Sequence, residues 1–208
     1  MYDWSNSVYN LVINTSIFPI YYTAVTANET AGDTVSFFGF EFINSVLYSY
    51  AISLSYLLSA LILPLLSGIA DYTGKKKKYL KFFTTLGSIA CMGMFFFTAD
   101  SLEWGIICVV LASLGYSSGL VFYDAYLPEI APAHMTDRIS GRGYSFGYIG
   151  SAILLIISLV LITFYDTIGF PDKGMATRTV FLIVGVWWIG FAQIPFKNLP
   201  SNVFNRKP

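Results

Sequence analysis

Residues 67–78 read Ser67-Gly68-Ile69-Ala70-Asp71-Tyr72-Thr73-Gly74-Lys75-Lys76-Lys77-Lys78 and separate two long apolar runs. The pattern predicts a helix that ends at the acid and a backbone that turns at the glycine, before four consecutive lysines. Positively charged short loops are retained on the cytoplasmic side of a membrane. The segment therefore predicts a membrane protein and places this loop in the cytoplasm.

The whole chain has the composition and charge pattern of a polytopic membrane protein. Of its 208 residues, 55% are hydrophobic and 12% are charged, with a mean hydropathy of +0.63, whereas soluble domains carry about 25% charged residues. Charged residues bound six uncharged windows of 18 to 29 residues, and about 20 apolar residues cross a bilayer as a helix. We expect an all-α bundle, a single domain over residues 1–208, with six transmembrane helices at approximately 4–26, 44–70, 79–99, 105–127, 143–165 and 177–197.

The lysines and arginines predict the orientation of these spans. If the N-terminus is cytoplasmic, ten basic residues lie on the inner side, and only Lys173 and Arg178 lie on the outer side. This asymmetry follows the positive-inside rule. It predicts an integral membrane protein in contact with the lipid bilayer and with both termini in the cytoplasm.

Neutral polar side chains recur at helical spacing within four of the predicted spans. In the first span, Asn6, Asn10 and Asn14 share one helical face with Asp3. Amides that face lipid are costly, so these asparagines either hold helices together or line a path for a substrate. The further path candidates are Ser49, Ser53 and Tyr56 in the second span, Ser113 and Ser117 in the fourth, and Tyr144 and Tyr148 in the fifth. A neutral lining of this kind suits a small neutral or zwitterionic solute.

Asp124 is the one acid that falls within a predicted span. An acid inside a membrane is typical of a proton or cation site. However, Asp124 lies about one turn from the predicted inner end, close to Pro128 and Glu129. Two interpretations stay open: a proton site, and an interfacial acid that pairs with Arg138 or Arg142.

The motifs of enzymes, metal sites and nucleic-acid-binding proteins are missing from the sequence. It has one histidine, His134, and it lacks G-x-S-x-G, Walker and HExxH patterns. We therefore expect no catalysis, no metal site and no cofactor. The lysine run is short and adjoins a membrane span, so it indicates topology and contact with lipid headgroups rather than nucleic-acid binding.

Several segments resemble the family of the fungal autophagy-related vacuolar effluxer and its bacterial relatives within the major facilitator superfamily. They are Tyr2-Asp3-Trp4-Ser5-Asn6-Ser7 with Phe18-Pro19, the loop Ile69 to Lys77, the segment Phe122 to Ile130, and Arg138-Ile139-Ser140-Gly141-Arg142-Gly143 with Gly147, Tyr148 and Gly150. The resemblance covers the whole chain but only the first half of the twelve-helix fold. It implies a six-helix half built as a 3+3 inverted repeat, in a bacterial inner membrane.

The resemblance also implies functional residues. The superfamily's loop between spans 2 and 3 acts as a gate, which would comprise Asp71, Gly74, Lys75 and Lys76, with Arg138 and Arg142 beside it. The sequence departs from the family pattern at Asp124, where an asparagine is usual, and at Ser67, where the superfamily loop usually has glycine.

These features together predict transport of a small solute by alternating access. Analogy with the fungal effluxer suggests efflux of neutral amino acids, with a possible coupling proton at Asp124. Because the superfamily's site lies between two halves, a second six-helix half would be needed, either downstream in the same chain or in another subunit. The alternative is a six-helix membrane scaffold or subunit that transports nothing and requires a partner half.

Overall fold

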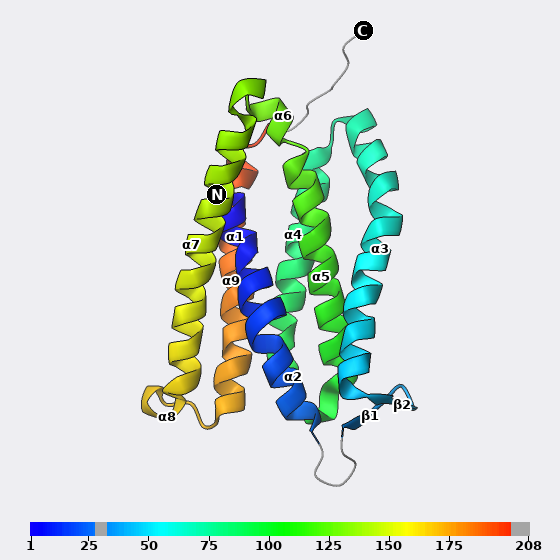
Figure 1. Ribbon diagram of the computed structural model, residues 1–208, viewed down its shortest axis with the longest axis vertical. Coiled ribbons are helices and arrows are strands. Elements are labelled where there is room, and N and C mark those ends of the chain that lie inside the picture. The colour runs from blue at the N-terminus through cyan, green and yellow to red at the C-terminus, as the bar shows by residue number, and fades with distance from the viewer. Residues whose placement is uncertain (28–32, 201–208) are drawn as a thin grey trace.

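The computed structural model describes residues 1–27 and 33–200, and almost all of them are helical. The long helices run side by side along one axis (Figure 1). They are α3 (Asn44–Thr73), α4 (Lys76–Gly93), α5 (Leu102–Asp124), α7 (Thr136–Thr163) and α9 (Lys173–Asn198), preceded by a helical run of α1 (Tyr2–Val8), a π-helix (Tyr9–Ile17) and α2 (Phe18–Thr26). Short helices are α6 (Leu127–Ile130), α8 (Tyr165–Ile168) and three 3₁₀ turns at Met94–Phe96, Ala99–Ser101 and Ala133–Met135.

Five of these helical segments are long and apolar enough to cross a membrane. They correspond to the second to sixth predicted spans, so the predicted all-α polytopic bundle is confirmed. The first predicted span is divided among α1, the π-helix and α2, and each of these pieces is too short to span a bilayer alone. The count of six transmembrane helices therefore stays a prediction.

The helix ends differ from the predicted spans for identifiable reasons. α7 begins at Thr136 rather than at residue 143, because the helix includes the charged residues at which the predicted span was ended. α5 ends at Asp124 rather than at residue 127. Pro128 occupies the first turn of the separate helix α6, a position where its missing N–H is tolerated.

The predicted outer connection 27–43 contains a short antiparallel hairpin. Strand β1 (Thr34–Phe37) pairs with β2 (Phe40–Ile43), and Phe37 lies opposite Phe40. Phe38 and Gly39 both have positive φ, at 49° and 83°, as a type I′ hairpin turn requires. The hairpin lies at the end of the bundle opposite α6 (Figure 1).

Two layers of helices form the bundle. In Figure 1, α7, the α1–α2 run, α5 and α3 lie toward the viewer, and α4 and α9 lie behind them. Small residues allow close approach between the layers: a Cβ on Gly115 of α5 would lie 2.6 Å from the Cα of Gly87 of α4. Trp188 of α9 is fully buried and stacks on Tyr9 at a centroid distance of 5.5 Å. We call the side formed by α7, the α1–α2 run, α5 and α3 the front face.

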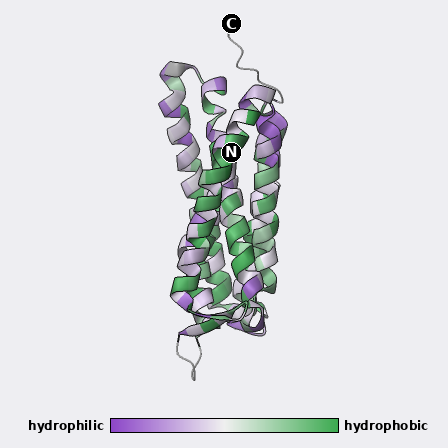
Figure 2. Cartoon of the chain, turned by 90° about the vertical axis from the view of Figure 1, so that its right-hand side faces the viewer, coloured by the Kyte–Doolittle hydropathy of each residue, from purple (hydrophilic) through white to green (hydrophobic). Residues whose placement is uncertain are grey.

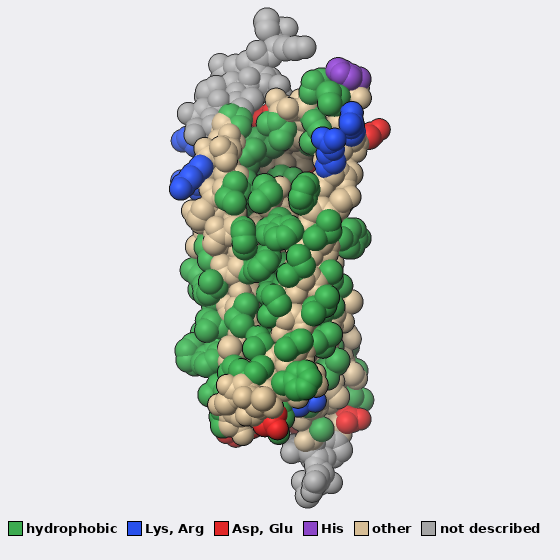
Figure 3. Space-filling view, turned by 90° about the vertical axis from the view of Figure 1, so that its left-hand side faces the viewer, with side chains coloured by type: hydrophobic (Ala, Val, Ile, Leu, Met, Phe, Trp, Pro, Cys, Tyr) green, Lys and Arg blue, Asp and Glu red, His purple; other side chains and the backbone are tan. Residues whose placement is uncertain are grey.

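Hydrophobic and charged residues separate along the bundle axis. Apolar positions dominate the middle of the helices, and strongly polar positions gather toward the ends (Figure 2). On the side that carries α7, hydrophobic side chains cover the body of the molecule, and the charged side chains lie near its two ends (Figure 3). This distribution is the one that a lipid bilayer requires of a spanning bundle.

Candidate functional site

The predicted path residues differ in their exposure. Asn10, Ser49, Ser53, Tyr56, Tyr144 and Tyr148 are exposed, Asn14 and Ser117 are half-buried, and Asn6 and Ser113 are buried. All of them belong to the four elements of the front face. The exposed members are therefore available to a solute or a partner, and the buried ones are engaged inside the bundle.

Tyrosine side chains from three helices gather on the front face. Tyr116 of α5 lies within electrostatic range of Tyr56 of α3 and of Tyr144 and Tyr148 of α7. Three predicted path residues on two helices, α3 and α7, thus lie near one that the sequence analysis did not single out. Their phenol groups supply neutral hydrogen-bonding groups across the face.

The two serines of α5 hold helices together. The Ser113 hydroxyl lies 2.8 Å from the Tyr9 hydroxyl, and the Ser117 hydroxyl lies 2.7 Å from that of Ser59 on α3. Each pair links α5 to a neighbouring element of the front face. These contacts give Ser113 and Ser117 a structural role.

The three asparagines of the first span occupy different environments. Asn6 is buried, and its amide nitrogen has no partner in the described part of the chain. Asn10 and Asn14 lie on the π-helix, where the Asn14 amide nitrogen donates to the Asn10 side-chain oxygen at 3.3 Å. The predicted polar stripe therefore continues from the interior onto the exposed surface.

Asp124 lines a small cavity together with Asp3, Tyr123, Ser140 and Tyr144. The cavity volume is about 30 Å³, room for roughly one or two water molecules. Asp3 is buried, and the Tyr123 hydroxyl donates to its Oδ2 at 2.8 Å. The cavity is thus too small for an amino acid, but water and a proton fit.

Asp124 itself is the last residue of α5 and is exposed, rather than lying one turn inside a span. Within residues 1–27 and 33–200, it forms no ion pair with Arg138 or Arg142. Both arginines are exposed on the first turns of α7.

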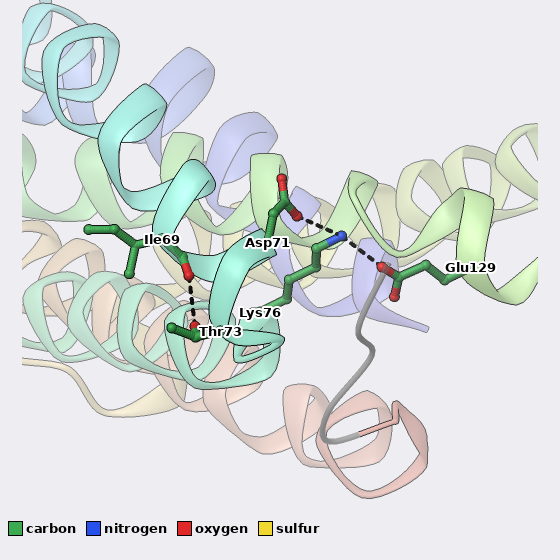
Figure 4. Close-up of polar contacts among 5 residues, drawn as sticks. All are labelled: Ile69, Asp71, Thr73, Lys76 and Glu129. Carbon is green, nitrogen blue, oxygen red and sulfur yellow. Dashed lines mark hydrogen bonds and ion pairs between the residues drawn. The ribbon is translucent and has the colours of Figure 1, made fainter. Parts of the chain in front are cut away.

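Lys76 links the predicted gating loop to the segment after α5. Gly74 caps the end of α3 with a left-handed φ of 68°, and the chain turns there into α4. The Lys76 ammonium lies 2.9 Å from Asp71 Oδ1 and 2.7 Å from Glu129 Oε1 (Figure 4). Lys76 is buried although it belongs to a lysine run, whereas Lys75 and Lys78 are exposed.

Glu129 is the functional candidate that sequence reasoning missed. Its carboxylate is buried on α6 and accepts the Lys76 ammonium, while its second oxygen has no partner in the described residues. The only sequence signal was its place after Pro128 in the family-like segment Phe122 to Ile130. We call Asp71, Lys76 and Glu129 the Lys76 triad.

Comparison with known proteins identifies the family. The family described as "Vacuole effluxer Atg22 like" matches residues 1–208. The chain belongs to this Atg22-like family. Its membership and its apolar helices make it an integral membrane protein.

Individual relatives of this Atg22-like chain come from bacteria and fungi. It is 32% identical over 198 residues to "Uncharacterized MFS-type transporter YxiO" of Bacillus subtilis. This match covers 94% of the chain and 44% of the Bacillus protein. It is 25% identical over 218 residues to "Autophagy-related protein 22" of Yarrowia lipolytica, covering 77% of the chain and 36% of that protein. The chain thus spans less than half the length of these relatives. No solved structure matches it significantly.

Proposed function

We propose that this chain moves a small neutral or zwitterionic solute across the membrane by alternating access. The observation that carries the proposal is the front face, where three elements, the π-helix, α3 and α7, expose phenol, amide and hydroxyl groups. Polar groups at membrane depth are tolerated where they line a cavity or contact protein. The family membership supports the same proposal.

The solute class follows from the charges of the front face. Its exposed path candidates are asparagine, serine and tyrosine, which are neutral side chains. A polyanion or a multivalent cation would find no counter-charge among them. Neutral amino acids match, since their two opposite charges can be met by neutral donors and acceptors. The efflux direction is proposed by analogy with the family description, "Vacuole effluxer Atg22 like".

The Lys76 triad is proposed as the gate. Lys76 at the start of α4 joins the end of α3 to α6, which lies between α5 and α7. Movement of α3 and α4 relative to α6 would have to separate Lys76 from one of its carboxylates. Breaking a buried ion pair costs about 3–5 kcal/mol, which is enough to bias an equilibrium between two states. Gly74 supplies the tight turn that brings Lys76 back toward Asp71.

We propose that a second six-helix half completes the path over the front face. The chain covers 44% of the Bacillus relative and 36% of the Yarrowia relative. Superfamily sites lie between two such halves. On this proposal, both termini of the chain are cytoplasmic, the membrane is the bacterial inner membrane, and a coupling proton binds at Asp124.

Counterflow in proteoliposomes tests the proposal. Vesicles that hold the chain together with its second six-helix half are loaded with unlabelled leucine, glutamine and tyrosine and are then given each radiolabelled amino acid outside. We expect saturable accumulation of label, above that of protein-free vesicles. Absence of accumulation for the whole panel would contradict neutral amino acid transport and would favour the scaffold alternative.

A further inference from the structure

The middle of the first predicted span is a π-helix of nine residues, Tyr9–Ile17. Its hydrogen-bond register is visible at its end, where the Phe18 N–H donates to the Ile13 carbonyl five residues earlier. π-Helices normally occur as single turns inserted in α-helices, frequently at functional sites. A stretch of this length needs a local cause.

Pro19 supplies the first cause. A proline ring inside a helix clashes with the carbonyl four residues earlier, which here belongs to Thr15. A wider turn relieves that clash. Because proline also lacks an N–H, the Asn14 carbonyl, five residues earlier, receives no backbone donor from it. The Tyr48 hydroxyl of α3 donates to this carbonyl instead, at 3.4 Å.

Two hydroxyl groups supply the second cause. The Thr15 hydroxyl donates to the Asn10 carbonyl, and the Ser16 hydroxyl donates to the Leu11 carbonyl, each at 2.7 Å. Both bonds reach back five residues, which is the π register. The sequence from Thr15 to Pro19 therefore favours the wide helix through its own side chains.

The π-helix presents a matched donor and acceptor on the front face. Asn10 is exposed and Asn14 is half-buried, and the bond between their amides uses the Asn10 oxygen and the Asn14 nitrogen. In the described part of the chain, the Asn10 amide nitrogen and the Asn14 side-chain oxygen have no other side-chain or backbone partner. The hydrogen-bonded pair thus keeps one free donor and one free acceptor, near the middle of the run Tyr2–Thr26.

We propose that the Asn10–Asn14 pair of the π-helix is the binding site for the two charged groups of a zwitterionic amino acid. The solute carboxylate accepts from the Asn10 amide nitrogen, and the solute ammonium donates to the Asn14 side-chain oxygen. The pair carries no net charge, so it fits a solute whose own charges cancel. The inference rests on the proposed transport function and names the residues and solute groups that it uses.

Substitutions that remove one amide each provide the test. Asn10→Leu and Asn14→Leu keep a similar side-chain size but abolish the hydrogen bonds. The control is Thr23→Val, which removes an exposed hydroxyl that bonds only its own helix, at the Pro19 carbonyl, in the same run but outside the π-helix. Loss of a hydrogen bond to a charged group weakens binding by about tenfold or more. We therefore expect about a tenfold weaker binding of radiolabelled leucine for both asparagine variants, and wild-type binding for Thr23→Val.

A charge variant separates recognition from misfolding. Asn10→Asp places a carboxylate next to the solute carboxylate, so binding of leucine should fall. Leucine methyl ester lacks that carboxylate, so its binding should stay at the level that the wild-type protein shows. A misfolded protein would lose both ligands equally. Equal loss of both, together with wild-type leucine binding by Asn14→Leu, would overturn the assignment.

Binding and counterflow are measured on the same preparations, so the two proposals fail separately. If wild-type protein transports leucine and the asparagine variants keep its half-saturation concentration, the site lies elsewhere and transport stands. If wild-type protein binds leucine through Asn10 but does not transport it, the site stands and transport by this chain fails. If it neither binds nor transports the panel, both are wrong.

Discussion

Lys76 and Glu129 form an ion pair at 2.7 Å, and both side chains are more than nine-tenths buried. Asp71, the other partner of Lys76, is 55% exposed. The two carboxylates should therefore contribute very differently to stability. Removing one partner of a buried pair costs about 3–5 kcal/mol because the other charge is left uncompensated, whereas an exposed pair contributes about 0–1 kcal/mol.

The first prediction compares the two carboxylates of the Lys76 triad. Glu129→Ala should lower the thermal stability of the detergent-solubilised protein strongly, and Asp71→Ala should lower it little. The double variant Lys76→Met/Glu129→Leu should recover most of the loss, since two apolar groups of similar volume can replace a buried pair. Equal melting temperatures for Glu129→Ala and Asp71→Ala would show that the pair does not stabilise this end of the bundle.

The second prediction concerns the contact between α4 and α5. A Cβ on Gly115 would lie 2.6 Å from the Gly87 backbone, so Gly115→Ala forces the two helices apart. Overpacking of this kind costs about 1–3 kcal/mol. Gly190 of α9 is the matched control, because a Cβ there meets nothing within 4 Å, and Gly190→Ala should gain about 0.5–1 kcal/mol of helix stability. Thermal unfolding of both variants checks the pair. If Gly115→Ala unfolds at the wild-type temperature, α4 and α5 pack less closely than the 2.6 Å contact implies.

The third prediction concerns the proton proposed for Asp124. Asp124→Asn removes one of the two carboxylates that line the small cavity, the other being that of Asp3. Leucine counterflow should continue, but uptake driven by a pH gradient should no longer respond to that gradient. Asp137→Asn, on the exposed first turn of α7, is the control and should behave as wild type. An unchanged pH response of Asp124→Asn would return Asp124 to a structural role at the membrane interface.

The all-α polytopic bundle followed from the distribution of charge, because charged residues are excluded from the bilayer core. The helix ends did not follow, since α7 continues through Asp137, Arg138 and Arg142. The turn at Gly74 was predictable because it depends on neighbouring residues only.

The partners of side chains on other helices were beyond the sequence pattern. Lys76 looks like any member of a lysine run, and its burial depends on Glu129, which is far away in the chain. Ser113 and Ser117 had the spacing of a path lining, but their hydroxyls reach Tyr9 and Ser59. The π-helix had a readable local cause in Pro19, yet a proline at that place also permits a simple kink.

Side-specific labelling of Ser53 tests alternating access most directly. With the buried native residues Cys91 and Cys108 replaced by alanine, Ser53→Cys on the front face is treated with a membrane-impermeant maleimide from either side of oriented vesicles. Ile89→Cys is the control, an exposed position on α4 in the rear layer. Alternating access predicts that Ser53→Cys reacts from one side, that neutral amino acids shift its reactivity toward the other side, and that Ile89→Cys reacts from neither. A Ser53→Cys protein that stays unreactive from both sides, with or without amino acid, would contradict alternating access.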